Sequence, residues 1–284
     1  MTELDSTRPP SVLASLNLGE DGIYTGGQGD GGQEHERKLR GEVAAKAYDD
    51  YLGEIAHHHS IPVMDAEIDR FLATIPTGGI IVDVGGCWGW HWRRLADTRP
   101  DIRVVVVDFV RANLRHAQTL LKDDIGRRVF LVEGDATRLD FPDACFDGYW
   151  SVQTLQHIPA FPAAIAEAAR VLKHRGSFAC YSLNDPPLIR AVYALFGKYW
   201  HRQGTIPGAF WLERMNQNQI DTVTRTFGVA PRQHYSEVLF TPEFGLRIGA
   251  RGNWAGRVDA ALSGSGWPRL IARQHSLHLT KPGV

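Results

Sequence analysis

The segment IIVDVGGCWG at residues 80–89 decides how this 284-residue chain is interpreted. A run of apolar residues breaks there into a glycine-rich turn, and a helix-like stretch follows. This order predicts a buried strand that delivers a small ligand to a helix N-terminus. Glycine is needed at such a turn because a side chain would block the approach of the backbone to the ligand, and because tight turns often require positive φ.

A second strand supports a ligand site at the same place. Residues 104–107 are four consecutive valines, and Asp108 follows them, 25 residues after Asp83. An acidic side chain at that strand end holds the ribose hydroxyls in βαβ nucleotide sites. A dinucleotide turn needs G-x-G-x-x-G, but counting from Gly85 places Cys87 and Trp90 at the second and third glycine positions. We therefore do not expect NAD or FAD as the cofactor.

The turn resembles the first motif of the class I S-adenosylmethionine (SAM)-dependent methyltransferases, written D/E-x-G-x-G-x-G. The matching residues are Asp83, Gly85 and Gly89. Cys87 stands where the family has its middle glycine, so that Gly86-Cys87 reverses the frequent Cys-Gly pair. This reversal puts the local geometry of the turn in question and leaves the site itself in place.

Later segments extend the resemblance in the family's order. VFLVEGDA at 129–136 is similar to the third strand and its Gly-Asp-Ala end, and residues 141–151 are similar to the "F-x-x-x-x-F-D" fourth strand. Residues 155–158 resemble the "L-x-H" segment, and RVLKHRGS at 170–177 resembles "R-V-L-K-P-G-G" before strand five. The resemblance covers roughly residues 78–184, with a weaker closing strand at 274–281.

The resemblance implies an α/β fold: a Rossmann-like, seven-stranded methyltransferase sheet flanked by helices, with an N-terminal helical lid and C-terminal cap insertions. It implies SAM as the cofactor and S-adenosylhomocysteine as its product. Asp108 is then expected at the ribose hydroxyls, the glycine turn at the methionine part, and Asp135-Ala136 at the adenine. The full set of expected cofactor-binding residues is Asp83, Gly85, Gly86, Gly89, Asp108, Phe109, Asp135, Ala136, Ser151 and Gln156.

His157 is the candidate catalytic residue. A sulfonium makes its methyl carbon electrophilic, so that transfer requires an aligned nucleophile and sometimes the removal of a proton. The segment after the fourth strand opens into the crevice beyond the strand ends, which places His157 near that chemistry. The alternative is a helix-capping or structural histidine that closes the site.

These features predict a SAM-dependent methyltransferase with a small-molecule acceptor, for which a hydroxyl of a sugar or secondary metabolite is favoured. The first alternative is a carbon or nitrogen acceptor of the ubiquinone-biosynthesis-like type. Another is a non-catalytic SAM-binding regulatory module, motivated by the reversed Gly86-Cys87 pair. The acceptor, the metal dependence and the oligomeric state are left open.

Composition agrees with an ordinary globular enzyme. The chain is 43% hydrophobic and 22% charged, and its formal net charge is −1. A nucleic-acid substrate is not expected because no long block of Lys or Arg provides the electrostatic footprint. Cys87, Cys145 and Cys180 are too widely spaced for a C-x-x-C pair, which favours reduced thiols in a cytoplasmic protein. Neither a secretory signal nor a membrane-spanning segment is predicted.

We expect three parts along the chain. Residues 1–33 form a flexible lead, because the glycine cluster at 26–32 lacks the Gly-Lys-Ser/Thr ending of a phosphate loop. Residues 34–77 form a helical lid, on which the Tyr48-to-Tyr51 segment resembles a "Y-D" contact with the cofactor. Residues 78–284 form the methyltransferase domain. Its aromatic-rich insertions, at about 185–212 and 241–272, are either a substrate cap or a small accessory core.

Three consecutive histidines, His57-His58-His59, lie beside the predicted lid. Consecutive helix residues point in different directions, so at most two of them share a pocket. A zinc site needs further ligands, and the sequence spacing indicates none. We therefore predict no metal site, and we leave a substrate-pocket role and a capping or surface role open for these histidines.

Overall fold

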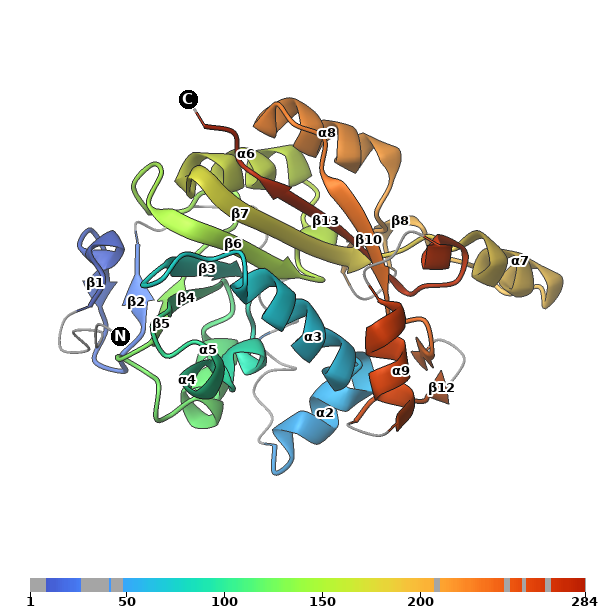
Figure 1. Ribbon diagram of the computed structural model, residues 1–284, viewed down its shortest axis with the longest axis horizontal. Coiled ribbons are helices and arrows are strands. Elements are labelled where there is room, and N and C mark those ends of the chain that lie inside the picture. The colour runs from blue at the N-terminus through green and yellow to red at the C-terminus, as the bar shows by residue number, and fades with distance from the viewer. Residues whose placement is uncertain are drawn as a thin grey trace.

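The computed structural model describes residues 9–26, 41, 48–206, 210–242, 246–251, 254–263 and 267–283. At the centre of the described part lies one large twisted sheet, with helices on both faces (Figure 1). Its nine strands, in spatial order, are β1 (Asn17–Leu18), β2 (Tyr24–Thr25), β5 (Val129–Glu133), β4 (Arg103–Asp108), β3 (Ile80–Val84), β6 (Phe146–Val152), β7 (Leu172–Leu183), β13 (Gln274–Thr280) and β10 (Arg232–Ser236).

The seven strands from β5 to β10 confirm the predicted sheet. Numbered along the chain among themselves, they lie in the order 3-2-1-4-5-7-6. The pairings from β5 through β7 are parallel, whereas β13 runs antiparallel to both β7 and β10. A dinucleotide-binding sheet has the order 3-2-1-4-5-6. The antiparallel β13, inserted before the last strand, thus separates this fold from that class, as the glycine turn indicated.

The first described segment adds two strands to the edge of this sheet. A short 3₁₀ helix, η1 (Ser11–Leu13), buries Val12 and Leu13, and β2 then pairs in parallel with β5. The flexible lead predicted for residues 1–33 is therefore wrong for residues 9–26, which gain their order from this pairing and burial. The rest of that lead, most of the glycine cluster and most of the helix expected before residue 48 lie outside the described residues.

Alternation along the strands builds two hydrophobic layers. On β3, Val82 and Val84 face the helices α6 (Phe161–Val171) and α8 (Gln217–Phe227), while Ile81 faces the opposite side. That opposite side is covered by α3 (Ile61–Leu72), α4 (Leu95–Thr98) and α5 (Arg111–Leu120) (Figure 1). The central strands are buried on both faces, as the run of valines in β4 predicts.

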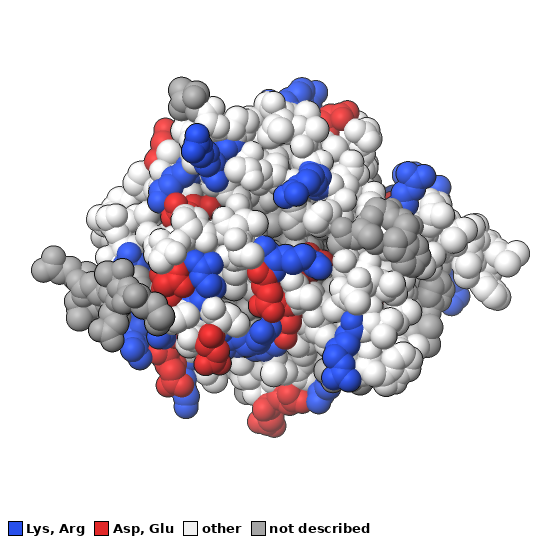
Figure 2. Space-filling view, in the orientation of Figure 1, with Lys and Arg blue, Asp and Glu red and all other residues white. Residues whose placement is uncertain are grey.

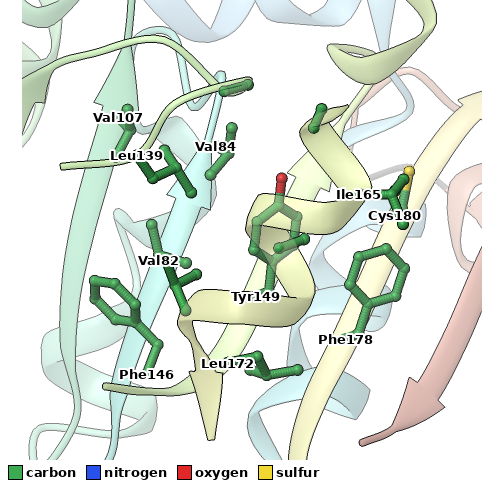
Figure 3. Close-up of a cluster of buried hydrophobic side chains, with 14 of the residues drawn as sticks. Val82, Val84, Val107, Leu139, Phe146, Tyr149, Ile165, Leu172, Phe178 and Cys180 are labelled. Carbon is green, nitrogen blue, oxygen red and sulfur yellow. The ribbon is translucent and has the colours of Figure 1, made fainter. Parts of the chain in front are cut away.

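The layer beneath α6 contains large aromatic rings. Tyr149 of β6 stacks on Phe178 of β7 with 5.3 Å between the ring centroids (Figure 3). Val82 on β3 and Leu172 on β7 belong to the same cluster. This packing fixes β6 between its neighbours and thereby fixes where the segment after β6 emerges.

Smaller elements surround the sheet. The helix α2 (Tyr51–His58) precedes α3, and α9 (Trp254–Leu262) packs against α3. No described helix has the length and apolar character that crossing a membrane requires. The remaining elements are η2 (Trp90–Trp92), η3 (Leu155–His157), α7 (Pro187–Leu195), β8 (Gln203–Thr205), β9 (Trp211–Glu213), β11 (Phe240–Thr241), β12 (Leu246–Arg247) and η5 (Trp267–Leu270).

A buried carboxylate, Glu237, joins the N-terminal helices to the C-terminal part of the chain. Its side chain is 0% exposed. One oxygen accepts a hydrogen bond from Ser60 N (2.7 Å), and the other receives the guanidinium of Arg273 (2.6 Å). Arg273 also donates to the carbonyl oxygen of His58 at 2.9 Å. The junction of α2 and α3 is thereby tied to the segments that flank β11 and β13.

Replacing Glu237 by alanine should strongly destabilise the fold, because Arg273 loses its buried counter-charge and Ser60 loses an acceptor. We expect the free energy of unfolding to fall by about 3–5 kcal/mol in urea denaturation. Glu237→Gln should cost less, since its amide oxygen can still accept from Ser60. The control is Arg251→Ala, which breaks an exposed ion pair with Asp50 and should change stability by about 1 kcal/mol or less. Equal losses of stability in Glu237→Ala and the control would show that this carboxylate does not tie the helices to the C-terminal part.

Candidate functional site

The candidate site lies at the edge of the sheet where the parallel strands end. Chain order reverses between β3 and β6, and open α/β sheets bind ligands outside the carboxyl ends of their strands at such a switch point. The glycine turn follows β3, Asp108 ends β4, and His157 lies shortly after β6. The structure therefore brings these three predicted features to one edge.

Two glycines of the turn have left-handed backbone conformations, and at Gly85 the surroundings also exclude a side chain. Gly85 has φ +70°, and a Cβ there would lie 2.0 Å from Cγ2 of Thr154. Gly89 has φ +61° and precedes η2. The turn is also tied to the neighbouring strand, because Gly85 N donates to the carbonyl oxygen of Val107 at 2.7 Å. The backbone of this turn is thus both constrained and closely packed.

In the reversed pair Gly86-Cys87, the glycine is needed for space and the cysteine has a left-handed backbone. A Cβ on Gly86 would lie 2.5 Å from the carboxylate of Asp83, so glycine is required here as well. Cys87 has φ +52°, in the left-handed region that a residue with a side chain seldom adopts. The cysteine carries the strain that a glycine would relieve in the family motif.

Asp108 joins this turn to the next one. Its Oδ2 accepts from Cys87 N at 3.0 Å, and its Oδ1 accepts from Val110 N at 2.8 Å and from the side-chain amide of Asn113 at 3.2 Å. The residue is 5% exposed. The strained backbone at Cys87 therefore points its N–H at the carboxylate that the sequence predicted for ribose hydroxyls.

Asp83 lies directly beneath the glycine turn, within the core. Its Oδ2 accepts from Trp92 Nε1 at 2.7 Å. Burial raises the pKa of Asp83 to about 7, and the hydrogen bond from Trp92 opposes that rise. Its other oxygen is buried and has no hydrogen-bond partner among the described residues. Asp83 supports the turn from within the core, and no motif in the sequence indicates its pairing with Trp92.

Ser151 and Gln156 also make structural bonds at this edge. Ser151 Oγ donates to the carbonyl oxygen of Val84 at 2.9 Å, and Gln156 Oε1 accepts from Leu183 N at 2.7 Å. They hold β3, β6 and β7 together where these strands end. Through these bonds the two side chains help to fix the position of the site.

The adenine end of the predicted site lies after β5. Asp135 folds back on its own segment, because its Oδ1 accepts from both the N–H (2.7 Å) and the hydroxyl (2.8 Å) of Thr137. Ala136 is buried, and Phe109 is half-buried directly after Asp108. These residues lie beyond the ends of adjacent parallel strands, β4 and β5, as the motif order predicts.

His157 is held by hydrogen bonds on both ring nitrogens. Nδ1 lies 2.7 Å from the carbonyl oxygen of Trp211, so this nitrogen carries the proton. Nε2 lies 3.1 Å from the amide nitrogen of Gln156 and accepts from it. The ring of Phe210 packs edge-on at 4.7 Å. This geometry favours the structural alternative, in which His157 attaches β9 to the segment after β6.

Aromatic rings cover the outer side of the turn, and the sequence indicated this cover only through the Tyr48-to-Tyr51 segment. The ring centroid of Trp88, within the turn, lies 4.7 Å from that of Tyr48 and 5.2 Å from that of Tyr51. The hydroxyl of Tyr51 lies 2.9 Å from Nδ1 of His116 on α5. Aromatic periodicity alone would not have found His116, since it comes from a distant helix.

The three consecutive histidines do not share a pocket. His57 and His58 are exposed, whereas His59 turns inward toward Trp90, with 5.8 Å between their ring centroids. Burial lowers the pKa of His59 well below its ordinary value. His91, next to Trp90, is also buried and has no hydrogen-bond partner on either ring nitrogen among the described residues. Burial lowers its pKa to about 3, so it is a neutral imidazole at pH 7.

The two predicted insertions meet at a small, partly open pocket. It lies just past the end of β7, because Arg214 on its wall donates to the carbonyl oxygen of Asn184 at 2.8 Å. The Arg214 guanidinium also lies 4.0 Å over the ring of Trp200. The walls are mainly apolar with two guanidinium groups, and the lining residues are Pro186, Ile189, Trp200, Arg214, Thr241, Ile271 and Arg273.

Comparison with known proteins identifies the central segment. Residues 82–180 match the methyltransferase domain family. The chain is 41% identical over 81 residues to the ubiquinone/menaquinone biosynthesis C-methyltransferase UbiE of a Bradyrhizobium strain, which covers 28% of this chain and 32% of that protein. It is 31% identical over 149 residues to the 27-O-demethylrifamycin SV methyltransferase of Amycolatopsis mediterranei, covering 49% and 54%.

The fold is also found among solved structures. An O-methyltransferase family protein from Burkholderia thailandensis aligns with a TM-score of 0.57 and 15% identity, over 88% of this chain and 64% of that one. This likeness concerns the fold alone. The chain spans about a third to just over half of the length of the curated relatives it matches, with 32%, 46% and 55% for the first three.

The raised pKa of Asp83 predicts a pH-dependent loss of stability. The folded-state pKa of about 7 lies above the ordinary value of 3.8, so the folded protein keeps a proton that the unfolded chain releases. Its contribution to the free energy of unfolding therefore falls as pH rises from about 4 to about 7 and is constant above that range. Asp83→Asn removes this dependence and should be more stable than wild type at pH 8, by up to about 4 kcal/mol.

The measurement is urea denaturation of wild type and Asp83→Asn at several pH values between 4 and 8, without cofactor. Asp97→Asn, which removes a carboxylate from the short helix α4, serves as the control. If the stability difference between wild type and Asp83→Asn does not change with pH, the pKa of Asp83 is not raised by burial.

Proposed function

The chain carries a methyltransferase domain of the class I SAM-dependent type, and from this premise we propose that it transfers the methyl group of SAM to a small apolar acceptor. One observation carries the proposal. The glycine turn and Asp108 meet at the switch point of the sheet, and a pocket built by both insertions lies past the end of the adjacent strand β7.

The residues at this edge match the needs of the cofactor. SAM supplies an electrophilic methyl carbon on its sulfonium. Asp108 lies at the end of β4, the position from which an acidic side chain holds the ribose hydroxyls in βαβ nucleotide sites, and backbone N–H groups already orient its carboxylate. The close-packed turn at Gly85 to Gly89 would meet the methionine part, while Phe109, Asp135 and Ala136 would bind the adenine.

For the acceptor we propose a phenol or quinol, methylated on carbon or oxygen. The pocket walls are mainly proline, isoleucine and tryptophan, and Thr241 contributes the one hydroxyl among the pocket-lining residues. This lining suits an aromatic body better than the sugar favoured from sequence. The guanidinium of Arg214, stacked on the ring of Trp200, lies in the same wall. The names of two relatives, a C-methyltransferase and an O-methyltransferase, support either atom.

A small molecule is the acceptor class that the charges favour. Figure 2 shows Lys and Arg interspersed with Asp and Glu over the face in view, without a single-sign stripe that would bind a phosphate backbone. We also propose a cytoplasmic location, supported by the thiols of Cys145 and Cys180, which lie in or against the core and form no disulfide.

Titration with S-adenosylhomocysteine tests the cofactor part of the proposal. We expect calorimetric binding by the wild type and a loss of about tenfold to a hundredfold in Asp108→Ala, because each hydrogen bond to a charged group contributes about 1.5–3 kcal/mol. The matched control is Asp101→Ala, just before β4 at its opposite end, where Asp101 pairs with Arg99. The control should bind like wild type. Absence of binding in wild type, or equal binding by all three proteins, would overturn the assignment.

Methyl transfer itself is tested by mass spectrometry with SAM and a panel of phenols, hydroquinones and glycosides. A mass gain of one methyl group on phenols or hydroquinones supports the acceptor class, and position analysis of the product separates carbon from oxygen. Transfer only to glycosides would reject the aromatic acceptor. Cofactor binding without transfer to any member would favour the non-catalytic SAM-binding module.

For His157 we propose a positioning role, supported by the hydrogen bonds on both ring nitrogens. His157→Ala should raise KM for the acceptor by about tenfold, since β9 loses one hydrogen bond of about 1 kcal/mol and the packing of Phe210. The pH profile of kcat should not change. If the variant instead abolishes transfer and removes a pH transition near the ordinary histidine pKa, His157 is the base that the sequence predicted.

A further inference from the structure

A second cluster of polar side chains lies away from the candidate site. It combines Glu67 of α3, His234 of β10 and His278 of β13, each of which offers one donor atom, and these three atoms all lie within 4.8 Å of one another. Glu67 is buried, and the two histidines are half-buried. The ring centroids of the histidines are 4.6 Å apart. Three different elements thus meet at one polar point.

The pairing of the strands explains this meeting. His234 lies opposite Ser276, which lies opposite Tyr181 on β7, so these three side chains share one face of the sheet. His278 is two residues beyond Ser276 and projects from the same face. The helix α3 covers this face, and its Glu67 accepts from the hydroxyl of Tyr181 at 2.8 Å.

We propose that Glu67, His234 and His278 bind a divalent transition-metal ion, with zinc as the best match. Two imidazoles and one carboxylate form a known zinc donor set that leaves one position for water. The Nδ1 atom of His234 is buried without a hydrogen-bond partner among the described residues, and a metal ion would satisfy it. Zinc holds such donors at about 2.0–2.2 Å, so each side chain needs a shift of about 1 Å toward the centre.

Neighbouring groups match the outer contacts of a metal site. Tyr181 orients the carboxylate, and Ser276 Oγ lies 2.9 Å from Nε2 of His278. The geometry of the three donors, which come from α3, β10 and β13, is the basis of the site.

Arg70 opposes a cation at this position. It forms an ion pair with Glu67, and its side chain is 43% exposed, so it can turn into solvent when a metal ion binds. Because a guanidinium repels a cation and competes for the carboxylate, its removal should strengthen metal binding. Removing Arg70 should thus strengthen metal binding, whereas removing any of the three ligands should weaken it, and this difference distinguishes Arg70 from the ligands.

The site is distinct from the cofactor edge of the sheet. His278 pairs with Ala179, four residues before the end of β7 at Leu183, which corresponds to about 13 Å along the strand. A metal ion here would clamp α3 to the strands β10 and β13. The proposal does not depend on the reaction that the chain performs.

The test is calorimetric titration of the full chain with zinc chloride, after treatment with a chelator and removal of that chelator. Wild type should bind one equivalent, and cobalt in place of zinc should give the visible absorption of a tetrahedral site. His234→Ala, His278→Ala and Glu67→Gln should each weaken binding by about tenfold or more, in line with the loss of one of three protein ligands. Arg70→Ala should bind several-fold more tightly.

Two control variants contain histidines outside the cluster. His275→Ala removes a histidine from the opposite face of β13, and the double variant His57→Ala/His58→Ala removes the exposed pair that can bind zinc adventitiously. Both should keep the equivalent bound by wild type, and circular dichroism verifies that every variant is folded. Absence of binding in wild type, or loss of binding only in the double variant, would overturn the proposal.

Discussion

The carboxylate of Asp108 joins two turns that strand pairing alone does not connect. It accepts from Cys87 N in the turn after β3 and from Val110 N in the turn after β4. Both acceptor oxygens are thus oriented by backbone groups before any ligand arrives. The left-handed backbone at Cys87, the close packing of Gly86 on Asp83 and the cover formed by Trp88 all depend on where this carboxylate holds the turn.

The fold and the central motifs could be predicted because they rest on local patterns. The four valines of β4 and the apolar run of β3 are buried on both faces, so their hydrophobicity is continuous along the sequence. The acidic residue at the end of β4 and the glycines after β3 could be predicted because a nucleotide site needs a carboxylate at the first position and close backbone approach at the second. The hairpin of β1 and β2 escaped prediction because two-residue strands have no periodicity to detect.

Several contacts of the site could not be predicted, because they join residues that are distant in the sequence. The sequence pattern around His157 predicts a base. In the structure its Nδ1–H donates to the carbonyl oxygen of Trp211 on β9, a partner that no sequence pattern indicates. The hydrogen bonds of Ser151 to Val84 and of Gln156 to Leu183 also join strand ends that only the folded chain brings together. The cluster of Glu67, His234 and His278 likewise has no spacing motif, because each residue comes from a different element.

The tie formed by Glu237 and Arg273 couples two parts of the structure that are distant in the sequence. The α2–α3 junction, from which the helices over the cofactor edge extend, is bonded through these two residues to the segments that bound the pocket. Arg273 itself lines that pocket. A displacement of the helices at this junction would therefore also displace Arg273 in the pocket wall, so that these two regions, distant in the sequence, are mechanically coupled.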